Sequence, residues 1–140
     1  MYTTEQIRSL RCRASAARLS YYVDFDEESD ERLAQVCNGI GADWMSERSR
    51  KVVTKAMKYM EASAMIHDWE YDAQIDTQEN ADERLLLNGL REVRFMYPQW
   101  YNWRRWLGER AVLAAYEVLS RTGKVAWALA YYNKNHKGKI

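Results

Sequence analysis

The chain has 140 residues, of which 47% are hydrophobic and 29% are charged, and this composition excludes a disordered protein. The length fits one domain, 1–140. The longest stretch without a charged residue, 33–42, has ten residues, which is too short to cross a bilayer. Two cysteines allow one disulfide at most and favour a reducing compartment. A signal peptide would need an apolar stretch near the start of the chain, where this sequence has four arginines among the first 18 residues. We therefore expect synthesis in the cytoplasm.

The net charge of +1 conceals a strong segregation of charge along the chain. Residues 61–83 contain eight acidic residues and no lysine or arginine, whereas residues 84–140 contain eleven basic residues and three acidic ones. An acidic patch suits a divalent cation, and a basic surface suits anionic lipid or nucleic acid. A charged segment on its own is more often an ordinary solvated face, and that interpretation stays open for both segments.

The chain has a single proline and no alternating apolar and polar stretch, which predicts an all-α fold. Apolar residues three or four apart predict a first helix over 4–23. The acidic run 24–31 leads into a short helix or turn that ends near Cys37. Gly39 and Gly41 then predict a break in regular structure.

The second half of the chain predicts three further elements. A long helix is expected over 46–72, followed by a polar loop and a helix that begins at Asn80 as N-cap and ends near Met96. After Pro98, a helix over 100–121 is expected to end at Gly123. A short aromatic segment and a basic tail follow.

The helices over 46–72 and from Asn80 are expected to form an antiparallel pair that brings His67 to Asp82. His67 lies on the apolar stripe of the first helix, and Asp82 lies near the start of the second. A carboxylate that accepts one imidazole N–H leaves the other ring nitrogen available as a general base. Tyr71, one turn after His67, is placed to donate its hydroxyl to Asp82. Adjacent helical residues diverge by about 100°, so Asp68 points elsewhere, and with carbonyl groups of the glycine turn it would make a site for a hard cation such as Ca²⁺.

The pattern "HDxxYD" at 67–72, with "AD" on the next helix and "CNGxGA" upstream, resembles phospholipase A2, particularly its disulfide-free phage and parvovirus-type members. The resemblance covers about residues 36–95. It implies a phospholipase A2-like antiparallel helix pair with additional N- and C-terminal helices. It also implies calcium-dependent hydrolysis of the sn-2 ester of glycerophospholipids at a membrane surface. The enzyme would be a phage or bacterial mobile-element product, which leaves association with a virion open.

The resemblance also implies a role for each residue of the motif. His67 would be the base that activates water, Asp82 its partner and Tyr71 the supporting hydroxyl. Asp68 and the backbone carbonyl groups of Cys37, Gly39 and Gly41 would bind Ca²⁺. The N–H of Gly39 would face the developing oxyanion.

Other interpretations of these residues stay open. A lone histidine on an apolar stripe is often structural, and Asp82 is also explained as an acid favoured by the helix dipole. Histidine–aspartate phosphohydrolases use an "HD" pair too, but they need further histidines, and the only other one here is His136. A different class is a catalytically silent phage structural or host-interaction protein on the same scaffold, which would bind other phage or host proteins.

The aromatic segment 97–106 also has two interpretations. Its tryptophans and tyrosines would pack around a helix start in the core, or they would form a surface with Arg104 and Arg105 that suits phospholipid. Aromatic residues beside arginines also suit single-stranded nucleic acid, but the sequence has no recognised DNA- or RNA-binding motif.

Overall fold

The computed structural model describes residues 2–37 and 45–136, and within these ranges the chain forms helices and no strand, which confirms the all-α prediction. No helix in these ranges is both long enough and apolar enough to span a bilayer. Cys12 and Cys37 are both free thiols. The six helices are α1 (Thr4–Ala16), α2 (Val23–Glu27), α3 (Asp30–Val36), α4 (Glu47–Ala73), α5 (Gln78–Met96) and α6 (Trp103–His136).

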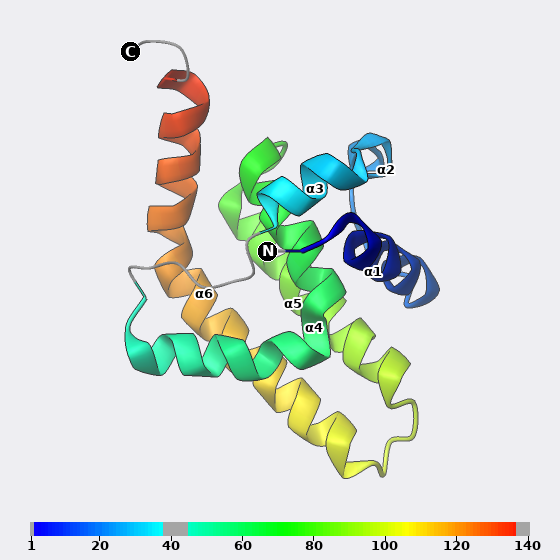
Figure 1. Ribbon diagram of the computed structural model, residues 1–140. Helices are drawn as coiled ribbons and strands as arrows, with labels where there is room; N and C mark the ends of the chain where they lie inside the picture. The colour runs from blue at the N-terminus through cyan, green and yellow to red at the C-terminus, as the bar shows by residue number, and fades with distance from the viewer. Residues whose placement is uncertain (1, 38–44, 137–140) are drawn as a thin grey trace.

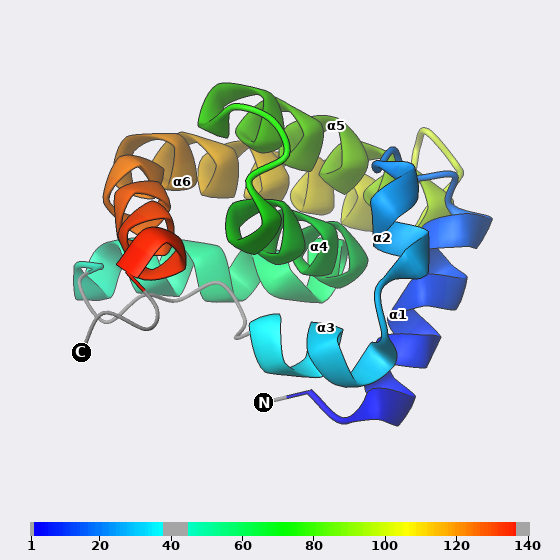
Figure 2. The same cartoon turned by 90° about the horizontal axis from the view of Figure 1, so that it is seen from above.

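Helix α4 is the centre of the fold. It lies between the group α1–α3 on one side and the pair α5–α6 on the other (Figures 1 and 2). Helix α5 runs back along α4 after a short turn, and α6 then crosses both of them (Figure 1). The expected antiparallel pair is therefore present, and α6 packs against both of its helices.

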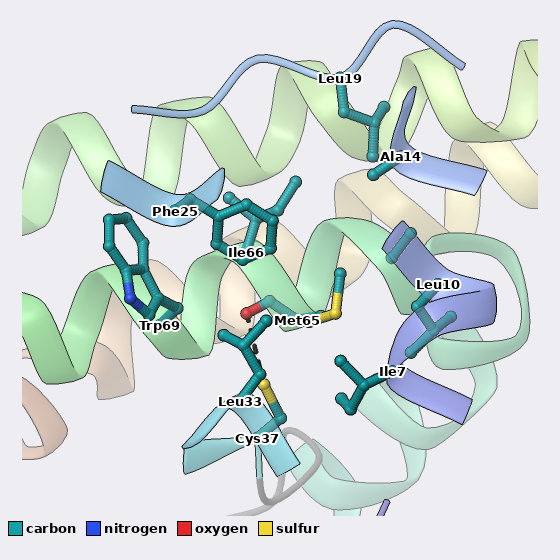
Figure 3. Packing of buried hydrophobic residues seen from close by; sticks show 11 residues of the cluster. Ile7, Leu10, Ala14, Leu19, Phe25, Leu33, Cys37, Met65, Ile66 and Trp69 are labelled. Atoms are coloured by element: carbon teal, nitrogen blue, oxygen red, sulfur yellow. Dashed lines mark hydrogen bonds between the residues drawn. The ribbon is translucent and has the colours of Figure 1, made fainter. Parts of the chain in front are cut away.

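Two hydrophobic clusters hold these layers together. The first joins α1–α3 to the second half of α4, where Phe25 packs edge-on against Trp69 with ring centres 5.4 Å apart (Figure 3). The second joins the first half of α4 to α5 and α6, through residues such as Met60, Leu85 and Val112. The two halves of α4 thus serve two separate parts of the core.

Helix α4 has a kink between these two clusters, which its apolar spacing did not indicate. Met60 has φ −139° and ψ 31°, outside the helical region. The carboxylate of Glu92 on α5 accepts hydrogen bonds from the N–H groups of Ala62 and Ser63, at 3.0 and 2.9 Å, and from the Ser63 hydroxyl at 2.6 Å. An inserted side chain that satisfies freed N–H groups is a recognised cause of a kink. Glu92 therefore acts as an N-cap for the second half of α4.

The first helix is shorter than predicted and ends at Ala16 instead of residue 23. Arg18 follows in the left-handed conformation, with φ 55°. Asn88 on α5 then binds the next stretch of chain: its side chain accepts from the N–H of Ser20 at 2.8 Å and donates to the Ser20 carbonyl oxygen at 2.7 Å. A contact between residues 68 positions apart thus holds the chain that follows α1 against α5, which local spacing could not reveal.

The two later helices also differ from prediction at one end each. The N-cap of α5 is Thr77, whose hydroxyl accepts from the N–H of Asn80, so the predicted cap Asn80 lies inside the first turn. Gly123 does not end α6, which continues to His136 and includes the short aromatic segment 125–132. In a helix interior, the absence of a side chain serves close packing, as the site shows below.

The aromatic segment 97–106 is mostly solvent-exposed, so its packing in the core, one of the two interpretations, is wrong for its tryptophans. Trp100 is 83% exposed, Trp103 64% and Trp106 56%. The glycine turn that followed Cys37 in the prediction, including Gly39 and Gly41, lies outside the described residues.

Candidate functional site

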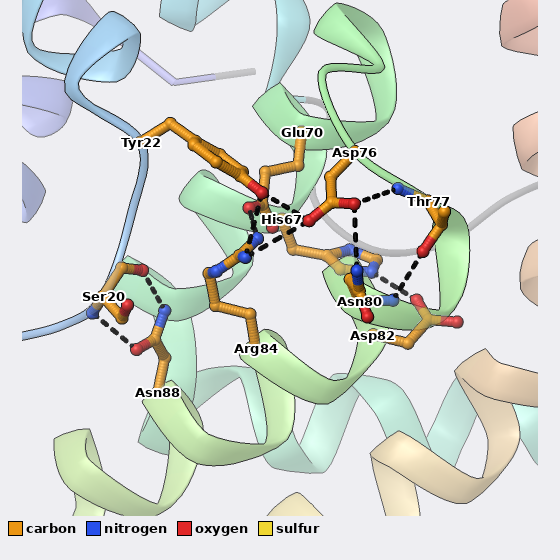
Figure 4. A network of polar contacts seen from close by, with 10 residues as sticks. All are labelled: Ser20, Tyr22, His67, Glu70, Asp76, Thr77, Asn80, Asp82, Arg84 and Asn88. Atoms are coloured by element: carbon orange, nitrogen blue, oxygen red, sulfur yellow. Dashed lines mark hydrogen bonds and ion pairs between the residues drawn. The ribbon is translucent and has the colours of Figure 1, made fainter.

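His67 and Asp82 form a buried pair between α4 and α5. The Nε2 atom of His67 lies 2.8 Å from Oδ1 of Asp82, and the two residues are only 4% and 3% exposed (Figure 4). Helix α4 presents His67 on the stripe that also buries Met60 and Ala64, and α5 runs back directly over it. The structure therefore brings together the two residues that the sequence analysis paired.

The surroundings of Asp82 determine which nitrogen of His67 carries the proton. The Tyr71 hydroxyl donates to Oδ1 of Asp82 at 2.7 Å, and Nε2 of Gln78 donates to Oδ2 at 3.4 Å. An ionised carboxylate only accepts, so Nε2 of His67 is the donor in their contact. In neutral His67, Nδ1 then carries a free lone pair. This buried atom makes no hydrogen bond to any described residue, which is rare for a buried polar atom.

Helix α6 holds Tyr71 in position from the far side. The Tyr71 ring packs edge-on against Trp127 with centres 5.0 Å apart, and the side-chain Nε2 of Gln74 donates to the backbone carbonyl oxygen of Trp127 at 3.0 Å. A Cβ atom at Gly123 would collide with the Tyr71 hydroxyl and would lie 2.9 Å from Nε2 of Gln78. Burial, and then the hydrogen bond to Asp82, raise the pKa of Tyr71. The hydroxyl therefore stays protonated and acts as a donor.

Asp68 points to a different part of the molecule, towards the end of α3. It is half-buried, and its charge raises the pKa of the Cys37 thiol and of Tyr2, after the larger effect of burial on both. The Cys37 thiol itself is buried and donates to the carbonyl oxygen of Met65 at 3.6 Å. Asp68 thus lies close to Cys37, the last described residue before the predicted glycine turn.

Two of the four predicted calcium ligands, Asp68 and Cys37, are described and lie close together. A carboxylate and a backbone carbonyl oxygen are donor types that Ca²⁺ accepts. Gly39 and Gly41 lie outside the described residues, and so does the N–H of Gly39 that was predicted to face the oxyanion. Within residues 2–37 and 45–136, no group of three or more His, Cys, Asp or Glu side chains is arranged to hold a metal ion. Asp68 and Cys37 thus fit Ca²⁺ only in donor type. The carbonyl groups of Gly39 and Gly41 stay the remaining predicted ligands.

A polar cluster beside the pair fixes the turn between α4 and α5 (Figure 4). Arg84 pairs with the buried Glu70 and lies 3.7 Å from Asp76, and its guanidinium stacks 4.6 Å from the ring centre of Tyr22. Hydrogen bonds from Tyr22, Asn80 and the backbone lower the pKa of Asp76 to about 2. Burial raises the pKa of Glu70 to about 7 despite the adjacent Arg84. The cluster anchors the turn that precedes α5, the helix that carries Asp82.

Several supporting residues were not predicted, and one signal in α5 would have indicated part of them. The inward face of α5 follows a spacing of four and three residues and carries unusually many polar side chains for a buried stripe. Its members are Gln78, Asp82, Leu85, Gly89 and Glu92. Gln78 and Glu92 were therefore detectable as buried polar residues. No sequence signal places Gly123 or Trp127 against Tyr71, because that contact depends on the path of α6.

The arrangement provides an oriented imidazole with a free Nδ1, a buried carboxylate to stabilise its protonated form, and a nearby acid facing another direction. Such a histidine can take a proton from water and return it to a leaving group. Comparison with protein-family models, with curated proteins and with solved structures finds no match to this chain.

Proposed function

We propose that this protein is a calcium-dependent phospholipase A2-like hydrolase that cleaves the sn-2 ester of glycerophospholipids at a membrane surface. The observation that carries the proposal is the His67–Asp82 pair, in which Nε2 is bound by the carboxylate and Nδ1 is left for a substrate water. The orientation of the pair, the support from Tyr71 and the separate direction of Asp68 agree with the roles that the resemblance to phospholipase A2 implies.

In the proposed reaction, Nδ1 of His67 takes a proton from water as the water oxygen attacks the sn-2 carbonyl carbon. The new C–O bond gives a tetrahedral intermediate with a negative oxygen, and Asp82 stabilises the positive imidazolium. The intermediate collapses with cleavage of the ester C–O bond. The imidazolium returns its proton to the departing glycerol oxygen, so a fatty acid and a lysophospholipid leave. Bound Ca²⁺, with Asp68, Cys37, Gly39 and Gly41 as ligands, would supply positive charge near the oxyanion.

Release of fatty acid from mixed micelles in the presence of Ca²⁺ tests the proposal. We expect turnover by the wild type and a loss of about 10²–10⁴-fold in His67→Gln, since general-base catalysis contributes on that order. Glutamine retains an N–H donor for Asp82, so this variant separates loss of the base from loss of the fold. Equal rates for both proteins, or no release by the folded wild type, contradict the proposal.

The metal site has its own test, which does not depend on turnover. We expect Ca²⁺ to raise the melting temperature of the wild type, because a ligand that binds only the folded state stabilises it. The increase should vanish in Asp68→Asn and persist in Asp72→Asn, one turn later on α4 and paired with Arg32 at 2.8 Å. An unchanged increase in Asp68→Asn would remove this residue from the calcium site.

A second candidate function is favoured by the burial of the same pair. His67 and Asp82 are each less than 5% exposed, which also suits a buried structural contact. The protein would then be a catalytically silent phage structural or host-interaction protein on this scaffold. In that case His67→Gln would lower the free energy of unfolding, and neither protein would release fatty acid.

A further inference from the structure

Four aromatic side chains are exposed together where α5 meets α6. They are Trp100 (83% exposed), Tyr101 (73%), Trp103 (64%) and Trp106 (56%). Together with Arg104 and Arg110 we call them the corner patch. The connection between α5 and α6 protrudes from the helix pair at the end opposite to the α4–α5 turn (Figure 1). Single exposed apolar residues are ordinary, but a cluster of large aromatic residues marks an interaction surface.

The charges of the corner patch are arranged around its rings. The Arg104 guanidinium lies 5.4 Å from the ring centre of Trp103, and that of Arg110 lies 4.8 Å from the ring centre of Trp106. Nearby, Arg94 and Arg105 are instead paired with Glu109, at 3.0 and 3.1 Å. The patch therefore presents two cations that lie against aromatic faces while Glu109 neutralises their neighbours.

We infer that the corner patch binds the surface of a bilayer that contains anionic phospholipid. Tryptophan and tyrosine rings have an apolar body and a polar edge, and they prefer the headgroup level of a membrane. Arginines beside them are attracted to anionic headgroups. The protruding shape favours a bilayer over the alternatives. A stable protein interface needs a broad complementary face, and single-stranded nucleic acid is bound in a groove.

The corner patch is separate from the His67–Asp82 pair and acts on binding instead of chemistry. Asp82 lies near the start of α5, and the patch begins after its end, ~20 Å further along at 1.5 Å per residue. The choice of phospholipid as ligand rests on the proposed function. Binding itself requires no turnover, so the two can fail independently.

Co-sedimentation with vesicles of phosphatidylglycerol and phosphatidylcholine in equal parts tests the inference. All proteins carry His67→Gln, so that hydrolysis does not alter the lipid. We expect the parent to bind. Trp100→Ala with Trp103→Ala should bind about tenfold more weakly, because two rings that would insert into the headgroup region are lost. A control pair, Leu87→Ala with Tyr131→Ala, removes two exposed side chains (57% and 60%) away from the patch and should bind like the parent.

A second comparison tests the charges. Arg104→Gln with Arg110→Gln should weaken binding to these vesicles about fivefold per arginine, and should leave the weaker binding to pure phosphatidylcholine unchanged. No binding by the parent, or an equal loss in the control pair, overturns the inference. Tryptophan-dependent binding of a single-stranded oligonucleotide without vesicle binding overturns it in favour of nucleic acid. Vesicle binding without fatty-acid release by the wild type supports the corner patch and contradicts the enzyme.

Discussion

Asp82 and Glu92 are both buried carboxylates on α5, and each accepts hydrogen bonds from α4, but the donors differ in kind. Glu92 accepts from the backbone of Ala62 and Ser63 and from the Ser63 hydroxyl, and Arg13 lies 3.5 Å from it. Asp82 accepts only from side chains in the hydrogen bonds described above, and one of these belongs to a histidine.

This difference separates structural support from chemistry. The donors to Glu92 cannot change their protonation state near neutral pH, so that carboxylate stabilises a helix terminus. Among the donors to Asp82, the imidazole can bind and release a proton while its second nitrogen stays unbonded to any described residue. Burial of a carboxylate alone therefore does not suggest a reactive site, and the imidazole among the donors to Asp82 is what supports the proposed catalytic role.

The largest effect on stability is expected at Glu92. Replacement by alanine leaves the N–H groups of Ala62 and Ser63 unsatisfied in the core, so Glu92→Ala should lower the free energy of unfolding by about 3–5 kcal/mol. Glu92→Gln keeps an acceptor and should cost less, about 1–2 kcal/mol. Denaturant unfolding measures both. Equal, small losses in the two variants would contradict the capping role and remove the contrast with Asp82.

Glu70 offers a third buried carboxylate with which to sharpen the comparison, because one of its oxygens makes no hydrogen bond to a described residue. Burial raises its pKa from 4.5 to about 7 in the folded protein. Between these values the folded state binds more protons than the unfolded state, so the contribution of Glu70 to stability is complete below the lower value and is lost as pH rises through the upper one.

The predicted loss amounts to about 3 kcal/mol, at 1.36 kcal/mol per pKa unit. Unfolding curves of the wild type and Glu70→Gln across this pH range measure it. The glutamine variant should lack this part of the pH dependence. If the difference between the two proteins does not change with pH, the pKa of Glu70 is not raised.

Two glycines of α6 pack against opposite ends of the α4–α5 pair, one near Asp82 and one near Glu92. A Cβ at Gly123 would meet the Tyr71 hydroxyl and Gln78, both bonded to Asp82, whereas a Cβ at Gly108 would lie 2.9 Å from Val93 beside Glu92. Both alanine variants should lose about 1–2 kcal/mol of stability through overpacking. Only Gly123→Ala should also lower fatty-acid release, by about tenfold, because it displaces the support of Asp82. Equal activity losses would mean that the effect comes from packing alone.

The sequence predicts those parts of the molecule that depend on local spacing. The length of α4 follows from its continuous apolar stripe, and the contact of His67 with Asp82 follows from a short turn between two such helices. The separate direction of Asp68 follows from helical geometry alone. The catalytic and calcium-binding roles of these residues stay predictions.

The features that were mispredicted depend on contacts distant in sequence. Asn88 binds Ser20 just beyond the early end of α1, and α4 is kinked where Glu92 inserts. Gly123 was interpreted as a helix end, but it allows α6 to approach Tyr71 within a continuous helix. The sequence alone does not distinguish a glycine that ends a helix from one that allows close packing inside a helix. The position of the neighbouring helix distinguishes the two.

The rate of fatty-acid release by Asp82→Asn, with Ca²⁺ and mixed micelles, tests the contrast between the two carboxylates most directly. An amide in place of the carboxylate no longer fixes the proton on Nε2 of His67, so the rate should fall by about 10²–10⁴-fold in a protein that remains folded. Folded Glu92→Gln, measured alongside, should retain the wild-type rate. Folded Asp82→Asn with wild-type activity would contradict the assignment of His67 and Asp82 as the catalytic pair.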